Sequence, residues 1–234
     1  MTDKINNNYR SIYNLPYQYT IQAKVLFGRK VMRYKQWEMD HIADYLKIHA
    51  NGGTIIDMGC STGHMVEVLS EYFGHNRIHG ADIHLDSVNR NRTNFQLNQF
   101  HHIQNGFYKE NAGRFSAVTL MHVLEHVDQP IQMLKDVKHL LTEDGVLALS
   151  VPQERIRGDA AVFENLLNIG RGKFVNVHVR NYNYGRLAQD VHAAGLDILS
   201  HRYIHGFFPT VNGKRFGNYS LILYTKKAPN KNGA

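Results

Sequence analysis

The sequence predicts an α/β fold in which a mostly parallel sheet carries helices on both faces. Short apolar runs typical of buried strands alternate with segments whose apolar residues recur at helical spacing, a pattern that favours parallel strands joined by crossover helices. The last two strand patterns are joined by a glycine-containing connection, which indicates an antiparallel hairpin at one edge of the sheet. A chain of 234 residues suits one such domain with additions.

The first half of the chain alternates helix and strand patterns. Trp37, Ile42 and Leu46 recur at helical spacing, whereas Ile55 and Ile56 begin a short buried run that glycine ends. In order, these patterns predict a helix at 33–49, a strand at 54–57, a helix at 64–73, a strand at 78–83, a polar helix at 85–97, and strands at 100–103 and 115–121.

The second half continues the alternation. Pro130 begins a helix, because the fixed φ of proline suits a first turn, and Pro152 ends a strand, because proline has no N–H to donate. The stretch 153–184 has no clear periodicity. The expected elements are a short helix at 123–126, a helix at 130–141, a strand at 145–151, a helix at 184–194 that Gly195 stops, and strands at 196–203 and 219–224.

The composition indicates a folded protein without a membrane span. Hydrophobic residues make up 43% and charged residues 20%, which allows a substantial core. No apolar run approaches the roughly 20 residues that a spanning helix needs, and the polar first ten residues lack the apolar core of a secretory signal. Cys60 is the single cysteine, so no internal disulfide is possible. These features together predict a cytoplasmic protein.

The net charge of +7 favours anionic partners in general, such as phosphates, nucleotide-linked sugars or nucleic acid. The basic residues are scattered, however, and the longest basic run is Lys226-Lys227. We therefore expect a solvated basic surface, and the charge alone leaves nucleic acid open.

The segment 57–63, which reads D-M-G-C-S-T-G, lies at the expected turn from the first strand into its helix. Gly59 and Gly63 allow a tight turn and a close approach of the backbone to a ligand. Asp57 at the strand tip can accept a hydrogen bond from a ligand amine, or it can cap the helix. Cys60 is interpreted as a small packed residue, since no base stands beside it.

Asp82 ends the second expected strand, next to Ile83. A carboxylate there can bind both hydroxyls of a ribose. A dinucleotide site expects G-x-G-x-x-G, whereas only Gly59 and Gly63 occur in the turn, and the sequence contains no phosphate-binding G-x-x-x-x-G-K-[ST] string. The pattern favours a nucleoside ligand without a pyrophosphate, and an NAD-dependent oxidoreductase is kept as an alternative.

The segment 57–63 resembles motif I of class I S-adenosylmethionine-dependent methyltransferases, with Ser61 in place of the usual middle glycine. Asp82 matches the ribose-binding acid of that family. The segment 115–128, F-S-A-V-T-L-M-H-V-L-E-H-V-D, is similar to the fourth-strand signature of ubiquinone-biosynthesis-type O-methyltransferases, and segments at 141–147 and 178–196 resemble later parts of that branch. The resemblance implies a Rossmann-like methyltransferase fold with a seven-stranded sheet, and O-methylation of a small-molecule acceptor.

The resemblance also implies a binding site for S-adenosylmethionine at the carboxyl ends of the strands. Two departures concern the adenine: the family often has an acid after the third strand, where this chain has Asn105-Gly106-Phe107, and Ser116 replaces an acid before the fourth strand. The implied cofactor-binding residues are Asp57, Gly59, Cys60, Ser61, Gly63, Asp82, Ile83, Asn105, Gly106, Phe107, Met121 and His122.

An oxygen acceptor benefits from a general base, often histidine, and the resemblance favours His178 or His126 for that role. Glu125 and His126 can equally serve to hold their short helix. The set His122, Glu125, His126 and His178 loosely resembles the metal site of RNA ribose methyltransferases, which leaves a metal-assisted RNA enzyme as an alternative, although no metal is expected. A further alternative is a protein that binds S-adenosylmethionine without catalysing methyl transfer.

The expected domain organisation has three parts. Residues 1–50 form an N-terminal helical cap, residues 51–228 form the S-adenosylmethionine-binding domain with a lid insertion at 153–184, and residues 229–234 form a flexible tail. The cap and the lid are expected to cover the acceptor, because variable connections on a rigid scaffold carry specificity. Aromatic residues that could line an apolar acceptor pocket, or simply pack in the core, are Tyr17, Tyr19, Phe163, Phe174 and Tyr182.

Overall fold

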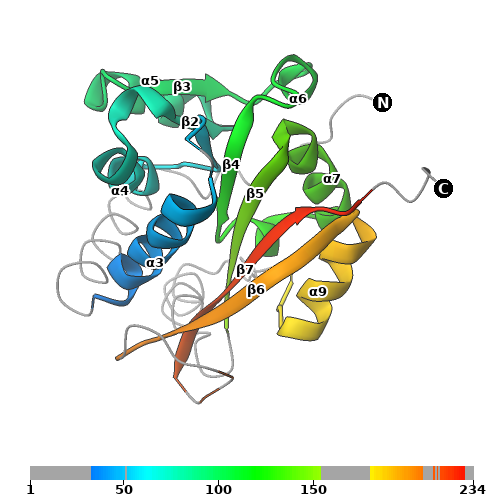
Figure 1. Cartoon of the computed structure of the whole chain (residues 1–234). Coiled ribbons are helices and arrows are strands. Elements are labelled where there is room, and N and C mark those ends of the chain that lie inside the picture. The colour runs from blue at the N-terminus through cyan, green and yellow to red at the C-terminus, as the bar shows by residue number, and fades with distance from the viewer. Residues whose placement is uncertain are drawn as a thin grey trace, which may run out of the picture.

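The computed structural model describes residues 33–50, 52–153, 180–207, 213, 215 and 217–229. One sheet runs through the middle of this part of the chain (Figure 1), with the strand order β3-β2-β1-β4-β5-β7-β6. The seven strands are β1 (Ile55–Met58), β2 (Ile78–Asp82), β3 (Gln99–His102), β4 (Phe115–Met121), β5 (Leu141–Pro152), β6 (Leu196–His205) and β7 (Asn218–Lys227).

The first five strands are parallel, and β7 runs antiparallel between β5 and β6. The predicted edge hairpin is therefore confirmed. In the centre of the sheet Asp57 stands between Gly80 of β2 and Thr119 of β4. Because parallel strands end at one edge of the sheet, the tips of β1, β2, β4 and β5 lie together, where open α/β sheets bind their ligands.

Two layers of helices enclose the sheet, as Figure 1 shows, and each layer forms a hydrophobic core against its own face. One face is covered by α3 (Tyr34–His49), α4 (His64–Phe73) and α5 (Leu85–Asn94), and the other by α6 (Phe107–Glu110), α7 (Pro130–Leu140) and α9 (Tyr184–Ala193). The predicted fold class, with helices on both faces of a mostly parallel sheet, is confirmed.

The expected elements are all present, and the differences lie at their ends. Helix α5 ends at Asn94, short of the predicted residue 97, and Leu97 is 66% exposed, so its apolar character did not mark a buried helix face. Strand β5 begins at Leu141, earlier than the predicted residue 145. The strand therefore includes polar residues that the sequence pattern assigned to a turn. Neither α6 nor η1 (His75–Arg77) was predicted, since each spans one turn or less of helix.

The helix of the predicted N-terminal cap packs as a member of one helical layer. Ile42 and Leu46 are fully buried, and Tyr45 stacks on Tyr224 of β7 with the ring centroids 3.6 Å apart. Residues 1–32 of the cap and residues 154–179 of the predicted lid lie outside the described residues, with Tyr17, Tyr19, Phe163 and Phe174. None of the helices in the described ranges is long and apolar enough to cross a membrane.

Candidate active site

The turn between β1 and α4 is tightly folded and supported by the neighbouring strand. Gly59 and Gly63 adopt φ values of 74° and 81°, the left-handed region that favours glycine. The backbone N–H groups of Gly59 and Cys60 donate to the Ala81 carbonyl of β2, at 2.7 and 3.0 Å. A Cβ atom at Gly59 would lie 2.6 Å from Cγ2 of Val123, so the turn packs against the segment after β4 without room for a side chain.

Ser61 occupies the position where the resembling motif has a glycine, and it too adopts a positive φ, of 44°. A left-handed conformation costs a non-glycine residue about 1–2 kcal/mol. Two contacts hold Ser61 there: its N–H donates to Oδ2 of Asp82 at 2.8 Å, and its carbonyl accepts from Nδ2 of Asn91 at 2.9 Å. The turn is therefore fixed from both β2 and α5 despite the missing glycine.

Asp82 lies buried at the tip of β2, with 4% of its surface exposed. Oδ2 accepts from Ser61, and Oδ1 accepts from the His84 backbone N–H at 2.8 Å. A carboxylate has about four acceptor positions, so each oxygen can accept a further hydrogen bond. Ile83 directly beside it is 53% exposed, an apolar surface next to an acid. This pair can receive a diol and a flat apolar group.

Asp57 is a second buried acid, and its side chain accepts a hydrogen bond from Oγ1 of Thr119 on β4 at 2.6 Å. Burial raises the pKa of Asp57 to about 7; the bond from Thr119 opposes this rise and the charge of Asp82 adds to it. The N-cap of α4 is Gly63, with no side chain capping the helix, so Asp57 does not serve as a helix cap. A cation placed beside Asp57 would restore its charge.

Other residues predicted for the cofactor differ in their exposure. The Cys60 thiol is buried, and burial raises its pKa, with the charges of Asp57 and Asp82 adding to the rise. It is therefore an unreactive packed residue, as the sequence indicates. After β3, Asn105 is exposed, whereas Phe107 is only 5% exposed and belongs to the core of the α7 face.

A polar cluster lies beyond the ends of β4 and β5. His122 has a positive φ of 51°, and its Nε2 lies 3.0 Å from both carboxylate oxygens of Glu38 on α3. Ser150 of β5 donates its hydroxyl to Oε1 of the same carboxylate. Burial works against the charged form of Glu38, but His122 and the hydrogen bonds lower the pKa of Glu38 below its usual value.

Glu125, in the short helix η2 (Leu124–His126), extends this cluster. Its Oε1 lies 3.7 Å from Nδ1 of His122 and 3.7 Å from Nε2 of His126, and its Oε2 is buried without a hydrogen-bond partner. Burial opposes the imidazolium of His122, but Glu38 and then Glu125 raise its pKa above the usual value. The two carboxylates therefore favour the protonated form of the His122 ring.

The sequence analysis did not identify Glu38, Ser150 or Thr119. The sequence does contain a sign of Glu38: this acid stands one helical turn before Ile42 and two before Leu46, on the face of the helix that is otherwise apolar. His178, predicted as a base, lies outside the described residues. In the part of the chain that the structure describes, no group of three His, Cys, Asp or Glu side chains is arranged to hold a metal ion.

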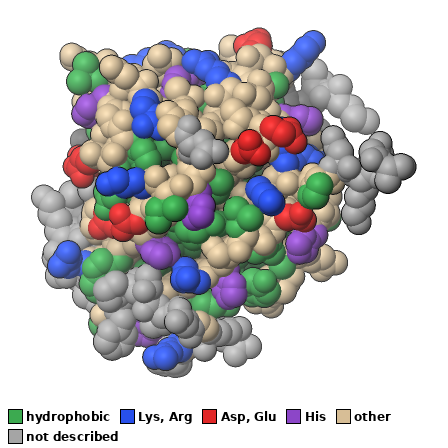
Figure 2. Space-filling view, viewed as in Figure 1, with side chains coloured by type: hydrophobic (Ala, Val, Ile, Leu, Met, Phe, Trp, Pro, Cys, Tyr) green, Lys and Arg blue, Asp and Glu red, His purple; other side chains and the backbone are tan. Residues whose placement is uncertain are grey.

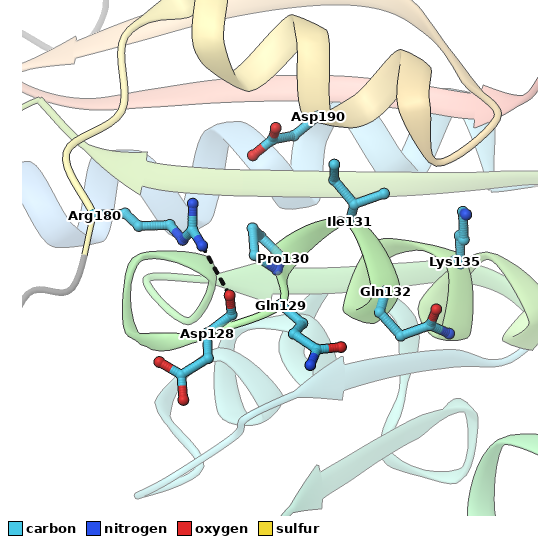
Figure 3. Close-up of a pocket in the computed structure, with 8 residues that line it drawn as sticks. All are labelled: Asp128, Gln129, Pro130, Ile131, Gln132, Lys135, Arg180 and Asp190. Atoms are coloured by element: carbon cyan, nitrogen blue, oxygen red, sulfur yellow. Dashed lines mark hydrogen bonds between the residues drawn. The ribbon is translucent and has the colours of Figure 1, made fainter.

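A pocket of about 380 Å³ lies between the start of α7 and the helix α9. Figure 3 shows Arg180 pointing toward Asp128, whose carbonyl accepts from Nη2 of Arg180 at 2.8 Å. The wall of the pocket carries both signs of charge and contains neither Asp57 nor Asp82. Its lining residues are Asp128, Gln129, Pro130, Ile131, Gln132, Lys135, Arg180 and Asp190.

Basic side chains are not clustered on the face of the molecule that Figure 2 shows. Lys and Arg side chains there are dispersed among acidic, polar and histidine side chains. This face therefore lacks the continuous basic stripe that a nucleic-acid backbone would need.

Comparisons with known proteins agree with this geometry. A family model described as a methyltransferase domain matches residues 29–201. A ubiquinone biosynthesis O-methyltransferase from Haemophilus ducreyi is 28% identical over 126 residues, covering 46% of this chain and 50% of that protein. A mitochondrial one from Dictyostelium discoideum is 27% identical over 144 residues, covering 50% of this chain and 44% of that protein. The match thus spans about half the length of these relatives.

The fold is shared with a solved structure along nearly the whole chain. The crystal structure of magnesium protoporphyrin IX methyltransferase from Synechocystis PCC 6803, with bound SAH, superposes with a TM-score of 0.67 at 16% identity. The superposition covers 95% of this chain and 99% of that one.

Proposed function

The chain belongs to the methyltransferase-domain family of S-adenosylmethionine-dependent enzymes, and on that premise we propose that it methylates an oxygen atom of a small-molecule acceptor. The observation that carries the proposal is the pair of buried acids, Asp57 and Asp82, on either side of the glycine turn. The similarity to two ubiquinone biosynthesis O-methyltransferases supports oxygen as the acceptor atom.

The residues at the tips of β1 and β2 fit S-adenosylmethionine. Asp82 has spare acceptor positions for the two ribose hydroxyls, and the exposed side chain of Ile83 offers an apolar surface for the adenine. Asp57 is a buried acid that forms no ion pair within the described residues, so it suits the ammonium group of the donor's methionine part. Gly59 and Gly63 allow the backbone to approach the donor closely.

We assign the remaining predicted cofactor contacts to three short segments. In this proposal Cys60 and Ser61 contribute backbone groups of the turn, Asn105 and Gly106 lie beside the adenine with the buried Phe107 behind them, and Met121 and His122 lie beside the methionine end. The N-terminal 50 residues and the segment 153–184 form the acceptor side as a cap and a lid on the methyltransferase domain 51–228.

When bound, S-adenosylmethionine supplies a methyl group on a sulfonium, which the acceptor oxygen attacks in line. The C–O bond forms as the C–S bond breaks, and the hydroxyl proton passes to a base. We propose His126 or His178 as that base. His126 faces the Glu125 carboxylate, which would stabilise the imidazolium that forms. Most of the acceleration comes from alignment, which the rigid strand tips provide.

The experiment incubates the purified chain with methyl-labelled S-adenosylmethionine and a matched panel of a phenol, an amine, a carboxylate and a thiol on one aromatic scaffold. We expect label in the phenol ether, and a strong reduction by Asp82→Asn. Label in the amine or thiol product alone would contradict oxygen as the acceptor atom. Donor binding without transfer to any acceptor, including a metabolite extract, would favour a silent binding protein.

A chelator arm addresses the metal-assisted alternative. The proposal expects the transfer rate to survive EDTA unchanged, because the residues named above act without a metal ion. A rate that EDTA abolishes and magnesium restores, with an RNA end as the preferred acceptor, would favour the metal-assisted ribose methyltransferase.

A further inference from the structure

Glu38 is an acid on the buried face of the N-terminal helix α3, and its partners lie far away in the sequence. Its carboxylate, 1% exposed, contacts the ring of His122 after β4 and the hydroxyl of Ser150 on β5, which are 84 and 112 residues distant. A buried ion pair is weak evidence for stability, because apolar residues of similar volume often stabilise a core as well or better. This arrangement therefore needs another explanation.

The backbone of His122 provides one. A φ of 51° is unusual for a residue other than glycine, and such conformations persist only where the surroundings hold them. The backbone N–H of His122 donates to the Ser150 carbonyl at 2.9 Å, and its ring is bonded to Glu38 at 3.0 Å. Glu125 lies further from the ring, at 3.7 Å, and the Tyr219 ring lies with its centroid 5.5 Å away, so Glu38 makes the shortest side-chain contact that can fix the direction of the ring.

The residue after His122 reaches the glycine turn. The side chain of Val123 occupies the space next to Gly59, where a Cβ would lie 2.6 Å from Cγ2 of Val123. The conformation of His122 sets where Val123 lies, so a series of contacts leads from Glu38 through His122 and Val123 to Gly59.

We propose that Glu38 is a positioning residue for the donor site: it holds His122 in the left-handed conformation and so keeps Val123 seated against Gly59. The proposal rests on the proposed function, because it takes the glycine turn to bind S-adenosylmethionine. Helix α3 thereby controls donor affinity through His122 and Val123, without Glu38 itself touching the donor.

The electrostatic surroundings of His122 favour this contact. The groups that face its ring are Glu38 and Lys35 on α3, Glu125 on η2 and Tyr219 on β7. Burial and Lys35 oppose the imidazolium, but the two carboxylates outweigh them and raise the pKa of His122. Removal of the Glu38 charge should therefore lower the pKa of His122, which ring proton signals measured by NMR can follow independently of donor binding.

The test measures the affinity for S-adenosylhomocysteine by calorimetry. Glu38→Leu introduces an apolar side chain that also favours a helix, and it removes the carboxylate that holds the His122 ring. We expect about tenfold weaker binding, which corresponds to about 1.4 kcal/mol. Glu38→Gln keeps an acceptor for the ring and should weaken binding only about twofold to threefold. Asp40→Ala on the same helix is the control.

The outcomes separate the two proposals. If the unaltered chain fails to bind S-adenosylhomocysteine, the proposed function fails. If that chain binds, while Glu38→Leu binds equally well with a lowered His122 pKa, the positioning role is overturned. An equal loss in Asp40→Ala would also overturn it, because that loss would come from α3 in general. Should Glu38→Leu not fold, Ser150→Ala removes one bond to Glu38 and should weaken binding about twofold; unchanged affinity there contradicts the proposal.

Discussion

Buried acids lie at two places along the sheet edge, and they differ in whether a basic side chain is paired with them. One place is the tips of β1 and β2, and the other is the tips of β4 and β5. Asp57 and Asp82 form no ion pair with any Lys, Arg or His of the described residues, whereas Glu38 is paired with His122 and Glu125 lies between two imidazoles. The first pair of strands is suited to receive a cation from outside. The second already has imidazoles beside its acids. Under the proposed function, the first region gains its positive partner from the bound donor, whereas the acids of the second region are paired within the protein.

The largest effect should follow from removing the imidazole that pairs with Glu38. His122→Asn tolerates the left-handed backbone but leaves the Glu38 carboxylate buried without its partner, so we expect the free energy of unfolding to fall by about 3 kcal/mol at pH 7. Urea unfolding measures this change. The double variant with Glu38→Gln carries no unpaired charge and should be clearly more stable than His122→Asn. Equal stabilities would show that the acid does not depend on His122.

Removing an acid from the donor side should act mainly on the ligand. Asp82→Ala takes away the acceptor for the ribose hydroxyls and for the Ser61 and His84 N–H groups, so the binding of S-adenosylhomocysteine should weaken by about 1–3 kcal/mol. Calorimetry provides the measurement. Asp86→Ala, an exposed acid in the first turn of α5, is the matched control and should bind normally. Unchanged affinity in Asp82→Ala would contradict the ribose assignment.

The same two regions differ in how far the sequence predicts them. Asp57, Gly59 and Gly63 stand within one short segment, and the expected second strand places Asp82 beside it, so local pattern and strand order suffice. The pair Glu38 and His122 forms only because α3 packs across the sheet onto the ends of β4 and β5, and no local pattern records such a distant contact.

The backbone of the site was predictable only in part. The two glycines predict positive φ values, but Ser61 and His122 adopt the same conformation although neither residue type is enough to predict it. Their tertiary contacts, Asp82 and Asn91 for Ser61 and Glu38 for His122, override local preference. The alternation of strands and helices was predicted well because central strands such as β1 and β4 are buried almost along their whole length and are mainly apolar.

Asp57 offers a test of how an unpaired buried acid affects stability. In the folded protein the pKa of Asp57 is about 7, above the unfolded value near 4, so the folded state binds more protons between these values and stability falls as the pH rises from about 4 to 7. Asp57→Asn keeps an acceptor for Thr119 and should remove this slope, which makes the ligand-free variant more stable than the unaltered chain at pH 7–8. Urea unfolding at several pH values measures the slope. A variant with the unaltered slope would show that Asp57 is already charged without a ligand.

The smallest effect concerns His79, a neutral histidine on β2 that shares a hydrogen bond with His101 at 3.0 Å. Burial lowers the pKa of His79 to about 4, and the charges of His101 and Arg114 add to this shift. The folded state therefore binds fewer protons than the unfolded state between about pH 4 and 6.5, and this contribution to stability is lost on acidification.

The dependence of stability on pH that His79 causes has the opposite sign to the one that Asp57 causes, so the two partly cancel in the unaltered chain. His79→Phe keeps the edge contact with Phe115 and should abolish a loss of roughly 1 kcal/mol between pH 6.5 and 5. Unfolding curves of the two single variants should therefore diverge in opposite directions, and parallel curves would mean that neither group titrates differently in the folded state.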